Sequence, residues 1–365
     1  MSGISTEFSN AVLDATKSFT LILDRKEQVA GLLPVHLDFY SDAYNKYQKS
    51  QGKDNPVVAT AKDGPWLISL DYPSYGPFME YADSEPERQK LYQAYMTRAS
   101  SGKWDNTPRI TELLRLRKQK AALLGFKNFS DYSVDNKMAQ SPQKVYELID
   151  KLSTYALKSG NKELSKLQEF SGQKTAGKKT SLQRWDVAYF SRMLKDESFG
   201  YKEEQLREYF PLSSVLTGLF DLASRVFSID IKDQTQKVQR WHKDVSYFEI
   251  FDQGSKEARA GFYLDPYSRP ENKRSGAWMD ECSLRRVTSK DAIQMPIAYL
   301  VCNFTPPVGE RPSLLTFRDV ETIFHEFGHG LQHMLTEVDE ADLSGINGIK
   351  WDAVELPSQF MENWC

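Results

Sequence analysis

The sequence has few cysteines and no long apolar run. Its three cysteines, Cys282, Cys302 and Cys365, lie too far apart for a disulfide framework or a thiolate metal cluster. No segment approaches the ~20 consecutive apolar residues of a membrane helix. The N-terminal segment has neither the basic start nor the apolar run of a secretory signal. We therefore expect a cytoplasmic protein in a reducing compartment, with no membrane partner.

Neither sign of charge dominates the 365 residues. The 47 lysines and arginines and 50 aspartates and glutamates give a formal net charge of −3. No overall basic field is present to hold nucleic acid or an anionic surface, so we expect no nucleic-acid partner. Hydrophobic residues make up 40% and charged residues 27% of the chain. These fractions are typical of globular proteins and exclude disorder as the main state.

Helical spacing of apolar residues marks two segments in the first half of the chain. Residues 105–124 predict a core-facing amphipathic helix. Ser141 and Pro142 are a cap and a first-turn proline, and they predict the start of a long second helix. The lysine-rich residues 173–181 predict an exposed, solvated loop. Later in the chain, β-branched and aromatic runs predict strands of one small sheet at residues 245–251, 258–265 and 297–304.

The motif HEFGH at residues 325–329 carries the clearest chemical signal. On a helix, His325 and His329 lie on one face and can share one tetrahedral metal ion. Glu326 is then close enough to take a proton from a metal-bound water. Thr316 and Asp319 predict a capped helix start. One face of this helix is apolar and the opposite face carries the motif, so we expect one face to pack and the other to coordinate.

Two histidines leave a zinc ion one protein ligand short of a hydrolytic site with an open position for water. Glu355 is favoured, because residues 351–364 start a second helix after a turn-rich connection and its carboxylate would face the first helix. Glu321, one turn before His325, is a candidate hydrogen-bond partner for a ligand imidazole. His333 lies two turns from His325, and we expect it behind the ligands or on the surface. The further candidates for the third ligand are Asp319, Glu337, Asp339, Glu340, Asp342, Asp352 and Glu362.

The segment FHEFGHGLQH followed by WDAVELPSQFMENW resembles the thimet oligopeptidase family of zinc endopeptidases. Other segments resemble that family in the same order, at residues 103–129, 184–191, 261–280 and 298–307. The resemblance implies one Zn²⁺ per chain bound by His325, His329 and Glu355, with Glu326 as the catalytic base. It also implies hydrolysis of short peptides by a zinc-activated water.

We expect a mainly α fold with a small β-sheet and a zincin-type active-site helix. Residues 1–240 would form a mainly helical lobe, and residues 241–365 the small sheet with the zinc-binding helices. By resemblance the chain covers roughly the middle half of a typical member, and the family's transition-state tyrosines lie beyond it. The alternative function is therefore a zinc- and peptide-binding chain without turnover. We expect a monomer in the cytoplasm, or in an organelle if a presequence precedes Met1.

Overall fold

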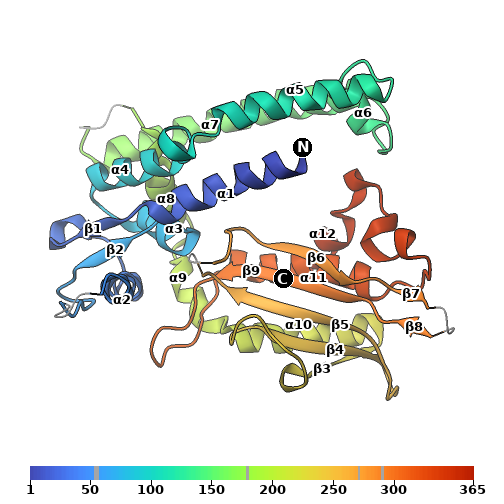
Figure 1. The fold of residues 1–365 in the computed structure, drawn as a ribbon. Helices are drawn as coiled ribbons and strands as arrows, with labels where there is room; N and C mark the ends of the chain where they lie inside the picture. Colours follow the sequence, from blue (N-terminus) through green and yellow to red (C-terminus); the bar gives the residue numbers. More distant parts are fainter. Residues whose placement is uncertain (53–56, 178–180, 270–271, 289–291) are drawn as a thin grey trace. The chain divides into compact units, whose positions relative to one another are not determined.

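The computed structural model divides the chain into two compact units, Met1–Tyr201 and Lys202–Cys365 (Figure 1). It describes all residues except 53–56, 178–180, 270–271 and 289–291. The fold is mainly helical with a small mixed sheet, as predicted. In the part of the chain that the structure describes, no helix has the length and apolar character needed to cross a membrane.

The first unit is built from helices and one short β-ribbon. Its ribbon pairs β1 (Leu21–Leu23) with β2 (Trp66–Ile68) in antiparallel register. The ribbon and the helices around it enclose a core in which Tyr40, Trp66 and Phe78 are fully buried. The α-helices of this unit are α1 (Ser2–Ser18), α2 (Pro34–Ser50), α3 (Tyr72–Tyr81), α4 (Glu85–Met96), α5 (Thr107–Leu123), α6 (Phe129–Val134), α7 (Pro142–Lys174) and α8 (Val187–Phe199).

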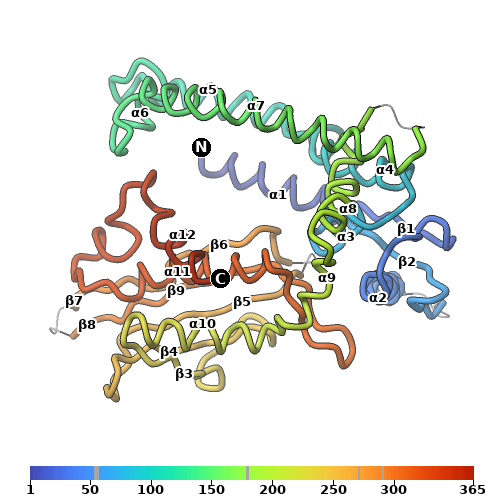
Figure 2. Tube along the Cα trace, turned by 180° about the vertical axis from the view of Figure 1, so that it is seen from behind, coloured from blue at the N-terminus to red at the C-terminus, as the bar shows by residue number. Residues whose placement is uncertain are grey.

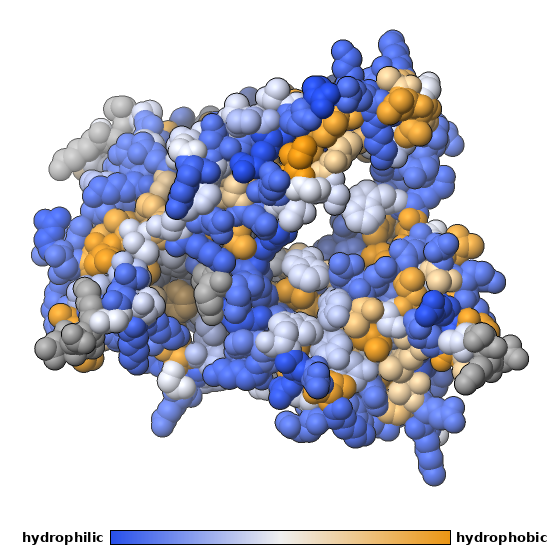
Figure 3. All heavy atoms as spheres, viewed as in Figure 1, coloured by the Kyte–Doolittle hydropathy of each residue, from blue (hydrophilic) through white to orange (hydrophobic). Residues whose placement is uncertain are grey.

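Helices α5 and α7 form where the sequence predicts them, and Ser141 caps α7 by accepting a hydrogen bond from the Lys144 N–H at 3.3 Å. Two details differ. Helix α7 continues to Lys174, into the predicted loop, whose residues 178–180 lie outside the described part. Helix α5 is not core-facing, since Ala121 is its one buried residue. Apolar side chains of α5 are exposed, among them Ile110, Leu114 and Leu123. Figure 3 shows apolar patches on the surface.

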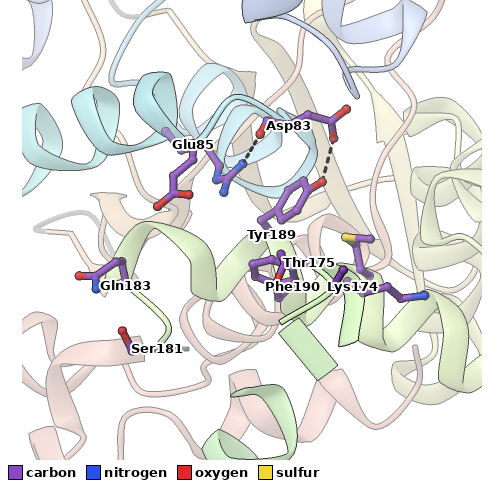
Figure 4. Close-up of a pocket in the computed structure, with 11 residues that line it drawn as sticks. Asp83, Glu85, Lys174, Thr175, Ser181, Gln183, Tyr189 and Phe190 are labelled. Atoms are coloured by element: carbon purple, nitrogen blue, oxygen red, sulfur yellow. Dashed lines mark hydrogen bonds between the residues drawn. The ribbon is translucent and has the colours of Figure 1, made fainter. Parts of the chain in front are cut away.

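A buried ion pair joins α4 to the turn before α8. The Arg88 guanidinium lies 2.9 Å from an Asp186 carboxylate oxygen, and both side chains are at most 3% exposed. Arg88 also donates to the carbonyl oxygen of Asp83, whose carboxylate accepts a hydrogen bond from the Tyr189 hydroxyl at 2.8 Å (Figure 4). Arg88, Asp83 and Tyr189 border a pocket of about 760 Å³ in this unit. The pair therefore supports both the core and the pocket wall.

Changing Asp186 to asparagine is expected to destabilise the protein by about 3–5 kcal/mol, because the Arg88 charge then stays buried without an opposite charge beside it. Urea unfolding of the variant would measure the loss. Asp63→Asn is the control, because Asp63 pairs with Lys26 at the surface, where both side chains are more than half exposed. Equal unfolding midpoints for the two variants would contradict a supporting role for the buried pair.

The second unit is a five-stranded sheet with helices packed on one face. The strand order is β3-β4-β5-β9-β6, in which β5 and β9 are parallel and the other neighbours antiparallel. Helices α10 and α11 run along this sheet (Figure 2). The strands and helices are α9 (Glu203–Leu206), α10 (Leu212–Phe227), β3 (Ile229–Asp233), β4 (Ser246–Asp252), β5 (Ala258–Tyr267), β6 (Trp278–Ser283), β7 (Arg286–Val287), β8 (Ile293–Gln294), β9 (Ile297–Phe304), α11 (Phe317–Met334) and α12 (Leu356–Glu362).

The three predicted strands are confirmed as β4, β5 and β9, whereas β3 and β6 were not predicted. The units meet between Tyr201 and Lys202, earlier than the expected boundary at residue 240. The physical reason is that α10 packs into the core of the sheet and β3 pairs along the whole of its length with β4. Residues 202–240 thus belong with the sheet. One core then supports the sheet and the helix that carries the HEFGH motif.

Candidate metal centre

Helix α11 carries the motif and begins with a reciprocal cap. The Thr316 hydroxyl accepts a hydrogen bond from the Asp319 N–H at 3.1 Å, and the Asp319 carboxylate accepts one from the Thr316 N–H at 2.9 Å. The apolar face of the helix packs on the sheet through Val320, Ile323, Phe324, Phe327, Leu331 and Met334. The predicted helix and cap are confirmed, and the opposite face is left to present His325 and His329.

Three of the predicted ligand side chains converge at one point. Glu355 Oε2 lies 3.2 Å from His325 Nε2 and 3.1 Å from His329 Nε2. One ligand atom from each residue lies within 4.8 Å of the others. Two imidazole nitrogens and one carboxylate oxygen form a donor set that suits zinc and leaves a fourth position for water. The residues present therefore fit such an ion, although their assignment as ligands remains a prediction.

The close approach of α12 to α11 brings Glu355 to the histidines (Figure 1). A Cβ atom on Gly328 would lie 2.5 Å from the Pro357 carbonyl oxygen and 2.7 Å from Ser358 Cα, so a side chain here would force the helices apart. The Ser358 hydroxyl lies 3.0 Å from Glu355 Oε2 and is buried with its residue. Gly328 and Ser358 thus set the position of the carboxylate.

Glu326 lies on the same helix as the two histidines and is only 5% exposed. Burial raises the pKa of its carboxyl to about 7; His325 opposes the rise and Glu355 adds to it. Burial also lowers the pKa of His329, although Glu355 acts in the opposite direction. The lowered pKa favours a neutral imidazole with a free lone pair. A carboxyl group with a pKa near neutrality beside a metal-type donor set can exchange protons with a water bound there.

Other candidate residues lie elsewhere. The carboxylate beside the imidazole of His325, a candidate ligand, is that of Glu362, whose Oε1 is 2.6 Å from His325 Nδ1, and not that of Glu321 as the sequence suggested. His333 is fully buried, not on the surface, and its Nε2 lies 3.0 Å from the Ser283 carbonyl oxygen, which ties α11 to the end of β6. Asp339 is engaged by Arg285 at 2.8 Å.

Gly328 and Ser358 were not predicted as groups that shape the candidate centre. Glu362 was predicted only as a possible ligand. A signal for Glu362 existed, because it follows Glu355 by seven residues and therefore falls on the same face of a helix.

Comparison with known proteins identifies the family of the chain. The sequence profile of peptidase family M3 matches residues 78–365. The chain belongs to peptidase family M3. This confirms the predicted resemblance and supports a peptidase function.

Relatives of this M3 chain are similar to it over nearly its whole length. The organellar oligopeptidase A, chloroplastic/mitochondrial, of Arabidopsis thaliana is 46% identical, over 99% of this chain and 45% of the relative. The probable cytosolic oligopeptidase A of the same plant is 45% identical, over 99% and 51%. Oligopeptidase A of Escherichia coli strain K12 is 42% identical, over 100% and 52%. The M3 chain thus spans about half the length of the curated relatives it matches.

Proposed function

We propose that this M3 chain carries the zinc-binding part of an endopeptidase site that hydrolyses short peptides. His325, His329 and Glu355 would hold one Zn²⁺ per chain, and Glu326 would act as the general base. The observation that carries the proposal is the convergence of three metal-type donors beside a buried glutamate in the HEFGH motif. The names of the relatives support oligopeptides as the substrate class.

Each residue has a defined task in this mechanism. When bound, zinc would supply Lewis-acid activation of a water and of the scissile carbonyl. Glu326 takes the proton of the attacking water and passes it to the leaving amine, a step to which its raised pKa is suited. Ser358 keeps the Glu355 carboxylate turned toward the histidines. The apolar face of α11 on the sheet keeps His325 and His329 in register.

A chelation experiment tests the proposal. Removal of metal by a chelator should abolish hydrolysis of a quenched-fluorescent peptide, and one equivalent of Zn²⁺ should restore it. Hydrolysis that persists without metal would rule the mechanism out. Zinc and peptide binding without hydrolysis would instead favour the binding chain without turnover, the alternative that the half-length coverage of the relatives keeps open. Two relatives bear cytosolic and organellar names, so we propose either compartment for this chain.

Gly328→Ala is expected to weaken zinc binding at least about tenfold, because the added methyl group meets the α12 backbone and moves Glu355. Titration with a competing chelator would measure the change. Gly330→Ala is the matched control, two residues along the same helix, where a Cβ would meet the flexible ends of Leu300 and Met334. Equal zinc affinities for the two variants would show that the helix crossing does not position the ligand.

A further inference from the structure

Two carboxylates contact the imidazole of His325 from different sides, one from Glu355 just before α12 and one from Glu362 at its end. Glu355 Oε2 is 3.2 Å from its Nε2, and Glu362 Oε1 is 2.6 Å from its Nδ1. The Nε2 edge faces His329 and the converging donors, whereas the Nδ1 edge faces the last residue of α12. Seven residues separate the glutamates, which places them about two turns apart on one helix face. Glu362 therefore lies outside the donor triad and contacts one of its members.

Glu362 offers a hydrogen-bond acceptor to Nδ1 of His325. A neutral imidazole has one N–H donor and one lone pair, and an ionised carboxylate can only accept. A zinc ion at Nε2 would use the lone pair of that nitrogen, so the one proton of a neutral His325 imidazole would sit on Nδ1, where Glu362 accepts it. This is the tautomer that a metal ligand needs at Nε2.

We propose that Glu362 is a positioning residue that fixes the tautomer and ring orientation of His325 for metal binding. The proposal rests on the proposed function. His325 has the greater need of such a partner, because its side chain is 26% exposed and that of His329 is 10% exposed. The close crossing at Gly328 holds α12, and so both glutamates, against α11. The crossing of α11 and α12 at Gly328 thereby places both Glu355, a candidate ligand, and Glu362, the group that orients His325.

Glu362→Ala should weaken zinc binding about tenfold, at the lower end of the ~10–100-fold range for groups behind a metal ligand, since the Glu362 side chain is 41% exposed. Glu362→Gln should lie between this variant and the wild type, because its amide oxygen still accepts from Nδ1–H but carries no charge. The matched control is Glu321→Ala, which removes an exposed carboxylate one turn before His325 on α11. This control should bind zinc as the wild type does.

A second readout reports the tautomer directly. The chain has five histidines, so ¹⁵N-histidine labelling gives a small set of imidazole signals in the zinc-loaded protein. The wild type should show a protonated Nδ1 for His325 that exchanges slowly with water, and Glu362→Ala should exchange it much faster. A purely structural role of Glu362 would leave this signal unchanged. If the alanine variant does not fold, judged by circular dichroism and melting, the glutamine variant carries the test through the same two measurements.

The outcomes distinguish a failure of the positioning role of Glu362 from a failure of the proposed function. Wild-type zinc affinity and an unchanged Nδ1 signal in the folded Glu362 variants would overturn the positioning role. If a variant of a proposed ligand such as His329→Ala loses zinc in the same experiment, the proposed function is retained. Retention of zinc by the ligand variant would overturn the proposed function itself. A loss of bound zinc from Glu362→Ala as complete as that from a ligand variant would show that Glu362 is itself a ligand, and would also overturn the positioning role.

Discussion

The His329→Ala variant is expected to lose stoichiometric zinc. His329 supplies one of three converging donors, and its Nε2 lies 3.1 Å from Glu355 Oε2. Its removal leaves one imidazole and one carboxylate, so the affinity should fall by more than the ~10–100-fold that loss of a group behind a ligand costs. Metal analysis after dialysis should find one zinc per chain in the wild type and close to none in the variant.

His242→Ala is the control for this experiment. It removes a histidine of the same unit that pairs with Asp244 at 3.4 Å and has no part in the donor triad. This variant should keep a full equivalent of zinc. If His329→Ala also kept a full equivalent, the metal would have to sit on other residues, and the convergence of His325, His329 and Glu355 would need another explanation.

Much of the candidate metal centre could be predicted because its determinants are local. The cap formed by Thr316 and Asp319, the apolar spacing on one face and the four-residue separation of His325 and His329 all lie within one helix. Such features follow from helical geometry alone, without knowledge of the rest of the fold. Glu355 is favoured for a related reason, since a second helix that follows a turn-rich connection can turn the carboxylate toward the first helix.

Features that depend on contacts between distant segments were harder to predict. Strand β6 exposes every second residue and contains Asp280 and Glu281, so its sequence has a weak strand pattern, and its pairing with β9 is what orders it. The same reason explains why residues 202–240 group with the sheet, because β3 becomes a strand through its pairing with β4. In both cases the partner strand, and not the local sequence, decides the structure.

The carboxylate that contacts His325 also depends on a contact between distant segments, and it was therefore hard to predict from the sequence. Glu321 was suggested because residues four apart on a helix are neighbours. Glu362, on the other helix, takes that place because Gly328 lets α12 approach within backbone contact of α11. The glycine is visible in the sequence, yet its effect depends on which helix crosses there. A pattern within one helix could not supply that information.

Glu326→Gln is expected to keep zinc and the fold while peptide hydrolysis falls by ~10²–10⁴-fold, the usual contribution of a positioned acid–base group. Glutamine has the size of glutamate but cannot accept the proton of the attacking water. Glu326 is not among the three converging donors, so the metal content should match that of the wild type. Hydrolysis of a quenched-fluorescent peptide by the full-length protein, with zinc analysis on the same sample, would measure both quantities.

The pH dependence gives this substitution a second, independent signature. The base must be ionised to act, so kcat/KM should fall as the pH drops through the pKa of Glu326. Burial raises that pKa to about 7, and the positive charge of a bound Zn²⁺ favours the carboxylate, so the acid limb should lie at or below neutrality. The residual activity of Glu326→Gln should lack this limb. A near wild-type kcat in the variant, or an acid limb unchanged by it, would require another residue to be the base.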